Sequence, residues 1–463
     1  MRDLAVGAES GSSVAGTVRL LASHQLEPTR PLHVVVGGLL DLNGFDQLFE
    51  SVTMQGGRVV TGSGTLTVTQ RVSTSIVMLE TATIEGNLNL GGGIVDFLVG
   101  DLLPPGETEI VVSGVIPDGG IRQDAAPAVT APGRLDLRGA NLYTGTTTVD
   151  AGTLAINGSI ASPTTIAPGA RLEGAGTIAG PIAAVGGTIA PGNCPGVLHS
   201  GSVALDSAST FVVEIAGTAV AAQYDQLDVT GTVALGGATL SIALGFAPQG
   251  GTAFVLIRND GTDPVAGIFA GLPEGAALVV GGTSFTISYR GGDGNDVVVA
   301  AKSDQVISFS NPGPLQLGVG TVGLVATSTS GLVVTAMSNS TGICTASGLS
   351  VTLLTPGVCA LTLSQPGSAA YNPAVPVDAS FAVVGAGIDS HAGRPGTGHA
   401  RPAARRARLG AATVPGARMP VSRDELAHRP GSQTPHDWYG ICITLVTRGA
   451  EARSESPSSA PPI

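Results

Sequence analysis

The feature that most constrains the fold is a short strand repeat between Gly133 and Pro195. Runs of alternating Leu, Val and Ile are separated, about every 8–12 residues, by Gly, Asn, Asp or Pro-Gly. This alternation of period two predicts β-strands, and nothing in the stretch has helical spacing. A Gly-Thr-aliphatic triplet recurs, beginning at Gly152, Gly176 and Gly187. Repeats this short cannot bury an apolar face alone, so the sequence predicts stacked strands in a parallel β-helix.

Stacking in parallel fixes which side chains face the interior. Within residues 131–200 the alternation places one set of aliphatic residues on the inward side of every strand. The expected inward residues are Val149, Leu154, Ile156, Ile166, Leu172 and Ile178.

Composition agrees with a solenoid and excludes other classes. The chain has 463 residues, of which 68 are Gly; 43% are hydrophobic and 12% charged. A disordered chain would have fewer aliphatic residues and more charge. The net charge of −12 argues against a nucleic-acid partner, which needs a clustered basic face. No stretch approaches 18 consecutive apolar residues, so no transmembrane helix is expected.

The repeat also carries a family resemblance. The run from Gly139 to Gly158, GANLYTGTTTVDAGTLAING, resembles the autotransporter-associated β-strand repeat of bacterial surface passengers. The segment TIAPGNCPG, from Thr188, resembles the rung that follows in those proteins. The resemblance covers residues 131–301 well and 34–100 loosely. It implies a right-handed parallel β-helix on an extracellular or cell-surface, outer-membrane-associated protein of a Gram-negative bacterium.

Composition and strand pattern change along the chain and divide it into segments. Residues 101–130, richer in Pro, Asp and Gly, are expected to leave the stack, and strands lengthen after Thr210. The predicted all-β organisation is a poorly patterned start at 1–33, a parallel β-helix at 34–203, a β-rich cap at 204–301, a small β-sandwich at 304–384 and a disordered Arg/Pro-rich tail at 385–463.

Residues 304–384 resemble bacterial immunoglobulin-like (Ig-like) repeats of surface proteins. The QVISF opening, SGLSVT, CTASG and GVCALT carry the resemblance. Cys344 and Cys359 lie in short apolar strands of this module, and an oxidising exterior favours a disulfide between them. The alternative is a pair of buried thiols.

Both ends of the chain differ from a complete passenger. The start, MRDLAVGAESGSSVAG, lacks a signal-peptide pattern, which favours a fragment. Residues 385–463 have almost no strand alternation. Codons for the segment from Ile388 can be chosen so that the reading frame shifted by one base encodes an apolar tail of the sorting type. Two interpretations of residues 385–463 therefore stay open: a frameshift product and an ordinary disordered tail.

Candidate sites are few. The run Gly291–Asp296, GGDGND, fits one copy of a calcium-binding nonapeptide core, with Asp293 and Asp296 as ligands, but one copy cannot supply both turns of such a site. Glycoside hydrolysis needs paired carboxylates. The candidate pairs are Asp225 with Asp228, Asp260 with Asp263, and Asp293 with Asp296, all beside turns, where Asp is favoured for backbone hydrogen bonding alone.

No nucleophile elbow, P-loop or zinc-protease motif is found, and no cofactor is expected. The sequence therefore predicts a non-enzymatic passenger with a structural or adhesive role, whose partners are host or cell-surface glycans or proteins. The alternative is a polysaccharide-acting β-helix enzyme, either a lyase or a hydrolase. An Arg-carboxylate cluster on one face of the solenoid would favour that alternative, and none is evident in the sequence.

Overall fold

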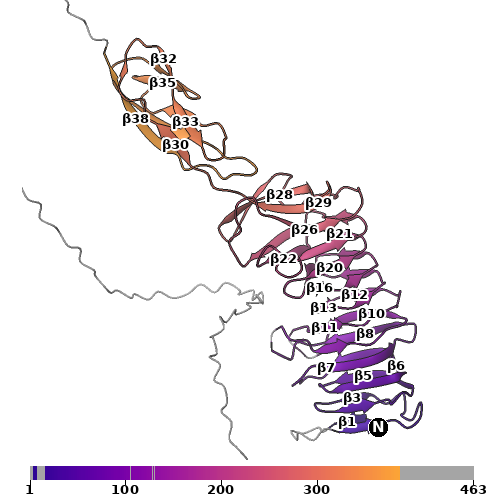
Figure 1. Cartoon of the computed structure of the whole chain (residues 1–463). Coiled ribbons are helices and arrows are strands. Elements are labelled where there is room, and N and C mark those ends of the chain that lie inside the picture. The colour runs from indigo at the N-terminus through magenta and orange to yellow at the C-terminus, as the bar shows by residue number, and fades with distance from the viewer. Residues whose placement is uncertain (1–3, 8–15, 105, 128, 130, 386–463) are drawn as a thin grey trace, which may run out of the picture.

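The computed structural model describes residues 4–7, 16–104, 106–127, 129 and 131–385, and in these ranges it contains strands and turns but no α-helix (Figure 1). Most strands pair in parallel with the equivalent strand one rung away. The protein is therefore all-β and built on a parallel β-helix, as predicted. The tail expected at 385–463 lies, from residue 386 on, outside the described residues.

The rungs align in three columns of parallel strands, numbered here by the order in which the chain visits them. The first column contains β1 (Leu4–Val6), β3 (Leu32–Val34), β5 (Gln47–Met54), β6 (Arg58–Thr74), β8 (Ile94–Val99), β10 (Gly120–Ala125), β12 (Thr147–Val149), β15 (Thr164–Ile166), β18 (Ile182–Ala184), β21 (Val203–Leu205) and β24 (Val233–Ala234). In the second are β2 (Thr17–Arg19), β4 (Leu39–Asp41), part of β6, β7 (Ala82–Asn89), β9 (Ile110–Val112), β11 (Arg134–Leu137), β13 (Thr153–Ile156), β16 (Arg171–Gly174), β19 (Thr188–Pro191), β22 (Thr210–Ile215) and β25 (Thr239–Leu244). The third runs through β14 (Ser159–Ile160), β17 (Thr177–Ile178), β20 (Val197–Ser200), β23 (Gln226–Val229) and β26 (Ala253–Asn259).

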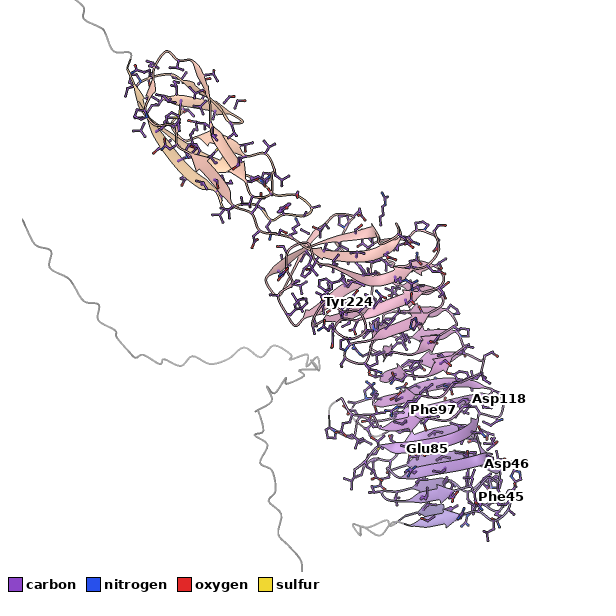
Figure 2. The ribbon with its side chains drawn as sticks, in the orientation of Figure 1. Phe45, Asp46, Glu85, Phe97, Asp118 and Tyr224 are labelled. Carbon is purple, nitrogen blue, oxygen red and sulfur yellow. A yellow bond between two sulfur atoms is a disulfide. The ribbon has the colours of Figure 1, made fainter. Side chains whose placement is uncertain are left out.

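Register in the columns explains the core. Leu135, Leu154 and Leu172 are lateral neighbours in consecutive rungs, so each buries its side chain against the same type of residue. All the predicted inward residues are fully buried, which confirms that prediction. Larger side chains such as Phe97 and Tyr224 fill the interior elsewhere along the stack (Figure 2).

Glycine makes the tight corners possible. Gly152, the first residue of the recurring triplet, has a φ of +83°, and a Cβ there would collide with the carbonyl oxygen of Gly133 in the rung below. Only glycine adopts this conformation without strain. The Gly-Thr-aliphatic triplet is therefore a corner followed directly by a strand.

The stack extends further than the sequence analysis expected. β1 and β2 pair in parallel with β3 and β4, so the described part of residues 1–33 is solenoid and not an unpatterned segment. β9 and β10, within 101–130, also keep their places in the columns, and only the connections leave the stack. Parallel pairing continues past residue 204 to β25 and β26, because longer strands keep the same register.

Antiparallel strands close the solenoid. β26 pairs with β29 (Asp296–Ala301), which pairs with β28 (Thr283–Gly291) and then β27 (Ala277–Val280). The change from parallel to antiparallel pairing covers the strand edge on which a further rung would otherwise stack.

A separate small core lies in residues 304–384 (Figure 1). Ser303 donates its backbone N–H to Ala370, and Thr286 of the cap donates to Ala369, so the module contacts the cap at its base. Its sheets consist of β30 (Ile307–Ser310) with β33 (Val325–Ser328); β31 (Leu315–Gln316), β38 (Val377–Val384), β37 (Gly357–Ser364) and β34 (Thr335–Ser338); and β32 (Thr321–Gly323), β36 (Ser350–Leu353) and β35 (Cys344–Ser347).

Candidate functional site

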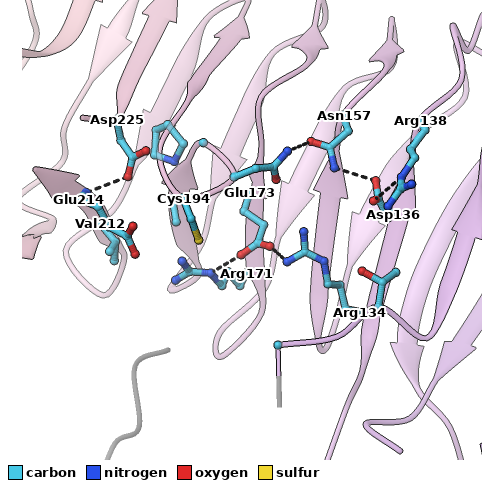
Figure 3. A pocket seen from close by; sticks show the side chains of 16 residues that line it. Arg134, Asp136, Arg138, Asn157, Arg171, Glu173, Cys194, Val212, Glu214 and Asp225 are labelled. Carbon is cyan, nitrogen blue, oxygen red and sulfur yellow. Dashed lines mark hydrogen bonds and ion pairs between the residues drawn. The ribbon is translucent and has the colours of Figure 1, made fainter. Parts of the chain in front are cut away.

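A polar hollow opens on the outward face of the second column. Outward residues of consecutive rungs align there, so Asp136, Ala155, Glu173 and Ala190 form one row. Because the two alanines are small, space remains between the acidic side chains. The hollow has a volume of about 280 Å³ (Figure 3). It is lined by Gly106, Thr108, Arg134, Asp136, Arg138, Asn157, Arg171, Glu173, Ala190, Pro191, Gly192, Asn193, Cys194, Val212, Glu214 and Asp225.

Glu173 lies at the centre of the hollow between two arginines. One carboxylate oxygen accepts a hydrogen bond from Nε of Arg171 at 2.8 Å, and the other forms an ion pair with Arg134. Thr153 separates the two arginines in the neighbouring row, which leaves room for both to converge. Burial lowers the pKa of Arg134. The central carboxylate is thus fully engaged.

Asp136 anchors the lower rim. The residue is 1% exposed, and its carboxylate accepts hydrogen bonds from Arg138 Nε at 2.8 Å and Asn157 Nδ2 at 2.9 Å. Asn157 in turn accepts the backbone N–H of Ala175 and an amide hydrogen of Asn193. A polar network therefore joins four successive rungs, those of β11, β13, β16 and β19.

Asp225 closes the upper rim. One carboxylate oxygen accepts the N–H of Gly196 at 2.9 Å, and the other accepts the N–H of Glu214 at 2.8 Å. Burial raises the pKa of Asp225 to about 7, against the opposing effect of these donors. Burial also raises the pKa of Glu214, while the positive charge of Arg171 opposes the shift.

The hollow holds four carboxylates but offers few free acceptors. Asp136, Glu173 and Asp225 each have both oxygens engaged by donors. Among the described residues, no hydrogen bond to the carboxylate of Glu214 is found. The arrangement can therefore bind hydroxyl or amide groups at Glu214, whereas glycoside hydrolysis requires two available carboxyls.

The candidate carboxylate pairs do not converge. Asp228 points away from the hollow on the third column, where it contacts His199 Nδ1 at 2.9 Å and Arg258 at 2.6 Å. Asp225 and Asp228 therefore act on different faces. Asp260 is exposed, and its backbone oxygen accepts from Asn295. Asp293 is exposed in the turn between β28 and β29, whereas Asp296 is buried and accepts the N–H of Asn259.

In the small module, Cys344 and Cys359 are joined by a disulfide with a Cα–Cα distance of 5.6 Å. Both half-cystines are fully buried in the core of the module.

The sequence analysis missed the Arg-carboxylate cluster, and its statement that none is evident was wrong for the folded chain. The signal was available in Arg134-Leu135-Asp136 and Arg171-Leu172-Glu173, which repeat the same charge pattern around an inward leucine. The two triplets lie in β11 and β16, the strands directly before and after β13 in the stack. Because both strands pair in register with β13, the two triplets lie on one face. Spacing along the chain alone does not reveal that coincidence.

Comparison with known proteins agrees with this architecture. Residues 132–156, which include β11, β12 and β13, match the family described as Passenger-associated-transport-repeat. The chain is also similar to the extracellular serine protease of Serratia marcescens, with 44% identity over 88 residues. That match covers 19% of this chain and 8% of the length of the Serratia protein.

The fold and this repeat define a β-helical passenger. The repeat in residues 132–156 and the similarity to an extracellular protein are those of autotransporter passengers, and they support a secreted or cell-surface protein. None of its described residues forms a helix with the length and apolarity that crossing a bilayer would require.

Proposed function

We propose that this passenger is non-catalytic and has a structural and adhesive role, with the hollow of the second column as its binding surface. The observation that carries the proposal is the saturation of Asp136, Glu173 and Asp225 by donors, because engaged carboxylates hold a surface rigid but cannot shuttle protons freely. Residues 304–384 then act as an Ig-like spacer at one end of the solenoid.

A saccharide is the partner that the hollow fits best. Arginine, asparagine and carboxylate side chains line it, and they donate to and accept from vicinal hydroxyl groups. The volume of about 280 Å³ suits one sugar residue of a longer glycan.

Binding of the full chain to an array of bacterial and host glycans tests the proposal. Glu214→Ala should reduce binding, because it removes the free acceptor while leaving the ion pairs around Glu173 in place. Glu85→Ala is the matched control, since Glu85 lies on the same solenoid outside the hollow, where it forms an exposed ion pair with Arg58 and accepts a hydrogen bond from Thr83. Equal binding by both variants would contradict a role for the hollow.

A second candidate function is that of a polysaccharide-acting enzyme. It is favoured by the presence of Glu214 and Asp225 in one hollow with raised pKa values, as acid-base chemistry near neutral pH requires. Incubation with a polysaccharide panel, followed by assays for new reducing ends and unsaturated products, tests it. Activity that Glu214→Gln abolishes would establish this candidate in place of the first.

Protease activity is not proposed. The similarity to the Serratia protein covers too small a share of that protein to carry its activity to this chain.

A further inference from the structure

Two polar loops meet at the closing end of the solenoid. The first follows β26 and contains Asp260 and Asp263; the second is the turn between β28 and β29. Asn295 Nδ2 donates to the carbonyl oxygens of Asp260 at 3.1 Å and Asp263 at 3.0 Å. Asn259 Nδ2 donates to the same Asp263 oxygen at 2.8 Å. The carbonyl oxygen of Asp263 therefore accepts hydrogen bonds from two asparagine amides, one at the end of β26 and one in the turn before β29.

Three side-chain oxygen atoms of this group are buried without a donor. Asn259 is 1% exposed and Asn295 is 5% exposed, yet Oδ1 of each has no hydrogen-bond partner. Oδ2 of Asp263 is likewise buried without a partner. Buried acceptors normally have donors, and a bound cation or an ordered water supplies the partner where the protein does not.

The protein does not supply that partner from the residues that the structure describes. Asp260, Asp263, Asp293 and Asp296 concentrate negative charge in the two loops, and the nearby Arg258 is engaged by Asp228 at 2.6 Å. Asp296 belongs to the same group, since its Oδ1 accepts the N–H of Asn259 at 2.9 Å. Negative charge and unsatisfied oxygens therefore coincide.

We propose that these loops bind a divalent cation, calcium, through Asn259 Oδ1, Asn295 Oδ1, Asp263 Oδ2 and the carboxylate of Asp296. Calcium takes carboxylate and amide oxygens and completes its shell with water, whereas zinc and copper prefer His and Cys, which the two loops lack. No three His, Cys, Asp or Glu side chains gather at any point of the described chain, so the asparagine amides are essential to the site.

This site differs from the hairpin motif considered from the sequence. That motif has Asp293 and Asp296 as ligands. The site proposed here keeps Asp296, but Asp293 is exposed on the turn, and the other ligands come from the end of β26, the loop after it and the turn before β29. Calcium would fasten the loop after β26 to the turn before β29, and so stabilise the antiparallel strands that close the solenoid.

The full chain, first stripped with a chelator, should bind calcium at one saturable site in a calorimetric titration, and its Tm should rise with calcium. Asp263→Asn and Asn295→Ala should each weaken binding by at least about tenfold. Asp293→Asn is the matched control and should bind as the wild type does.

Several results would overturn the proposal. One is a wild type that shows neither saturable binding nor a calcium-dependent Tm. Another is a loss of binding in Asp293→Asn that matches the loss in Asp263→Asn, since the hairpin alone would then hold the ion. If Asp263→Asn does not fold, Asn295→Ala and the wild-type titration decide the matter.

Discussion

The carboxylate of Asp225 accepts the backbone N–H of Glu214 at 2.8 Å, and so ties β22 to the strand that follows it in the third column. The other oxygen of Asp225 holds the N–H of Gly196 at the end of the preceding turn. One buried side chain thus fixes two neighbouring connections at the upper rim of the hollow.

This relationship predicts a pH dependence of stability. Burial raises the folded-state pKa of Asp225 to about 7, above the value of an unfolded aspartate. A raised pKa means that the folded state prefers the protonated form. The contribution of Asp225 is fully present at acidic pH and is lost as the pH rises from about 4 through about 7. Thermal unfolding measured from pH 5 to 8 should show this loss in the wild type.

Asp225→Asn should remove that part of the pH dependence, because the amide does not ionise. Asp101→Asn, at an exposed position, serves as the control and should keep the wild-type profile. Identical profiles for Asp225→Asn and the wild type would refute the assignment.

The ion pairs around Glu173 predict that removing its carboxylate destabilises the fold. Glu173→Ala leaves Arg134 and Arg171 facing each other without the carboxylate between them, and should lower the free energy of unfolding by about 1–3 kcal/mol. Glu85→Ala removes a pair whose side chains are 36% and 55% exposed, so it should cost at most about 1 kcal/mol. Urea denaturation of both variants measures the difference, and equal costs would count against the network.

Substitution in the core of the stack should reduce stability more than substitution in the ion pairs. Leu154 is fully buried between Leu135 and Leu172, and burying a leucine contributes about 1.5–3 kcal/mol. Leu154→Asp should lose this contribution and also bury a charge, and so disrupt its rung. Thr165→Asp, on the exposed face of β15, should change stability by less than about 0.5 kcal/mol. Circular dichroism melts distinguish them, and a mild effect of Leu154→Asp would be inconsistent with this core.

The disulfide predicts a covalent link that can be mapped. Peptide mapping of unreduced, exported protein should recover the peptides of Cys344 and Cys359 joined to each other. Because the bond closes a loop of 15 residues, replacing both cysteines by serine should destabilise the module by about 3 kcal/mol. Free labelling of both thiols without reductant would exclude the link.

The local pattern of the sequence was sufficient for the strands and for the inward set. Alternation between glycine corners decides both, because each side chain of a strand points to a fixed side whatever its neighbours are. Leu154, Ile166 and Leu172 were therefore predictable one by one. The ends of the solenoid were not, since β1 and β25 join it through pairing with a neighbouring rung, which leaves no mark in their own short sequences.

The hollow and the cap loops depended on tertiary structure. Arg134 and Glu173 are 39 residues apart in the chain, and only the parallel register across β13 brings them into one ion pair. Asn259 and Asn295 likewise meet at Asp263 because antiparallel strands reverse the chain over the last rung. Side-chain direction is a local property that the sequence determines, whereas contact between rungs is set by register, which only the folded stack decides.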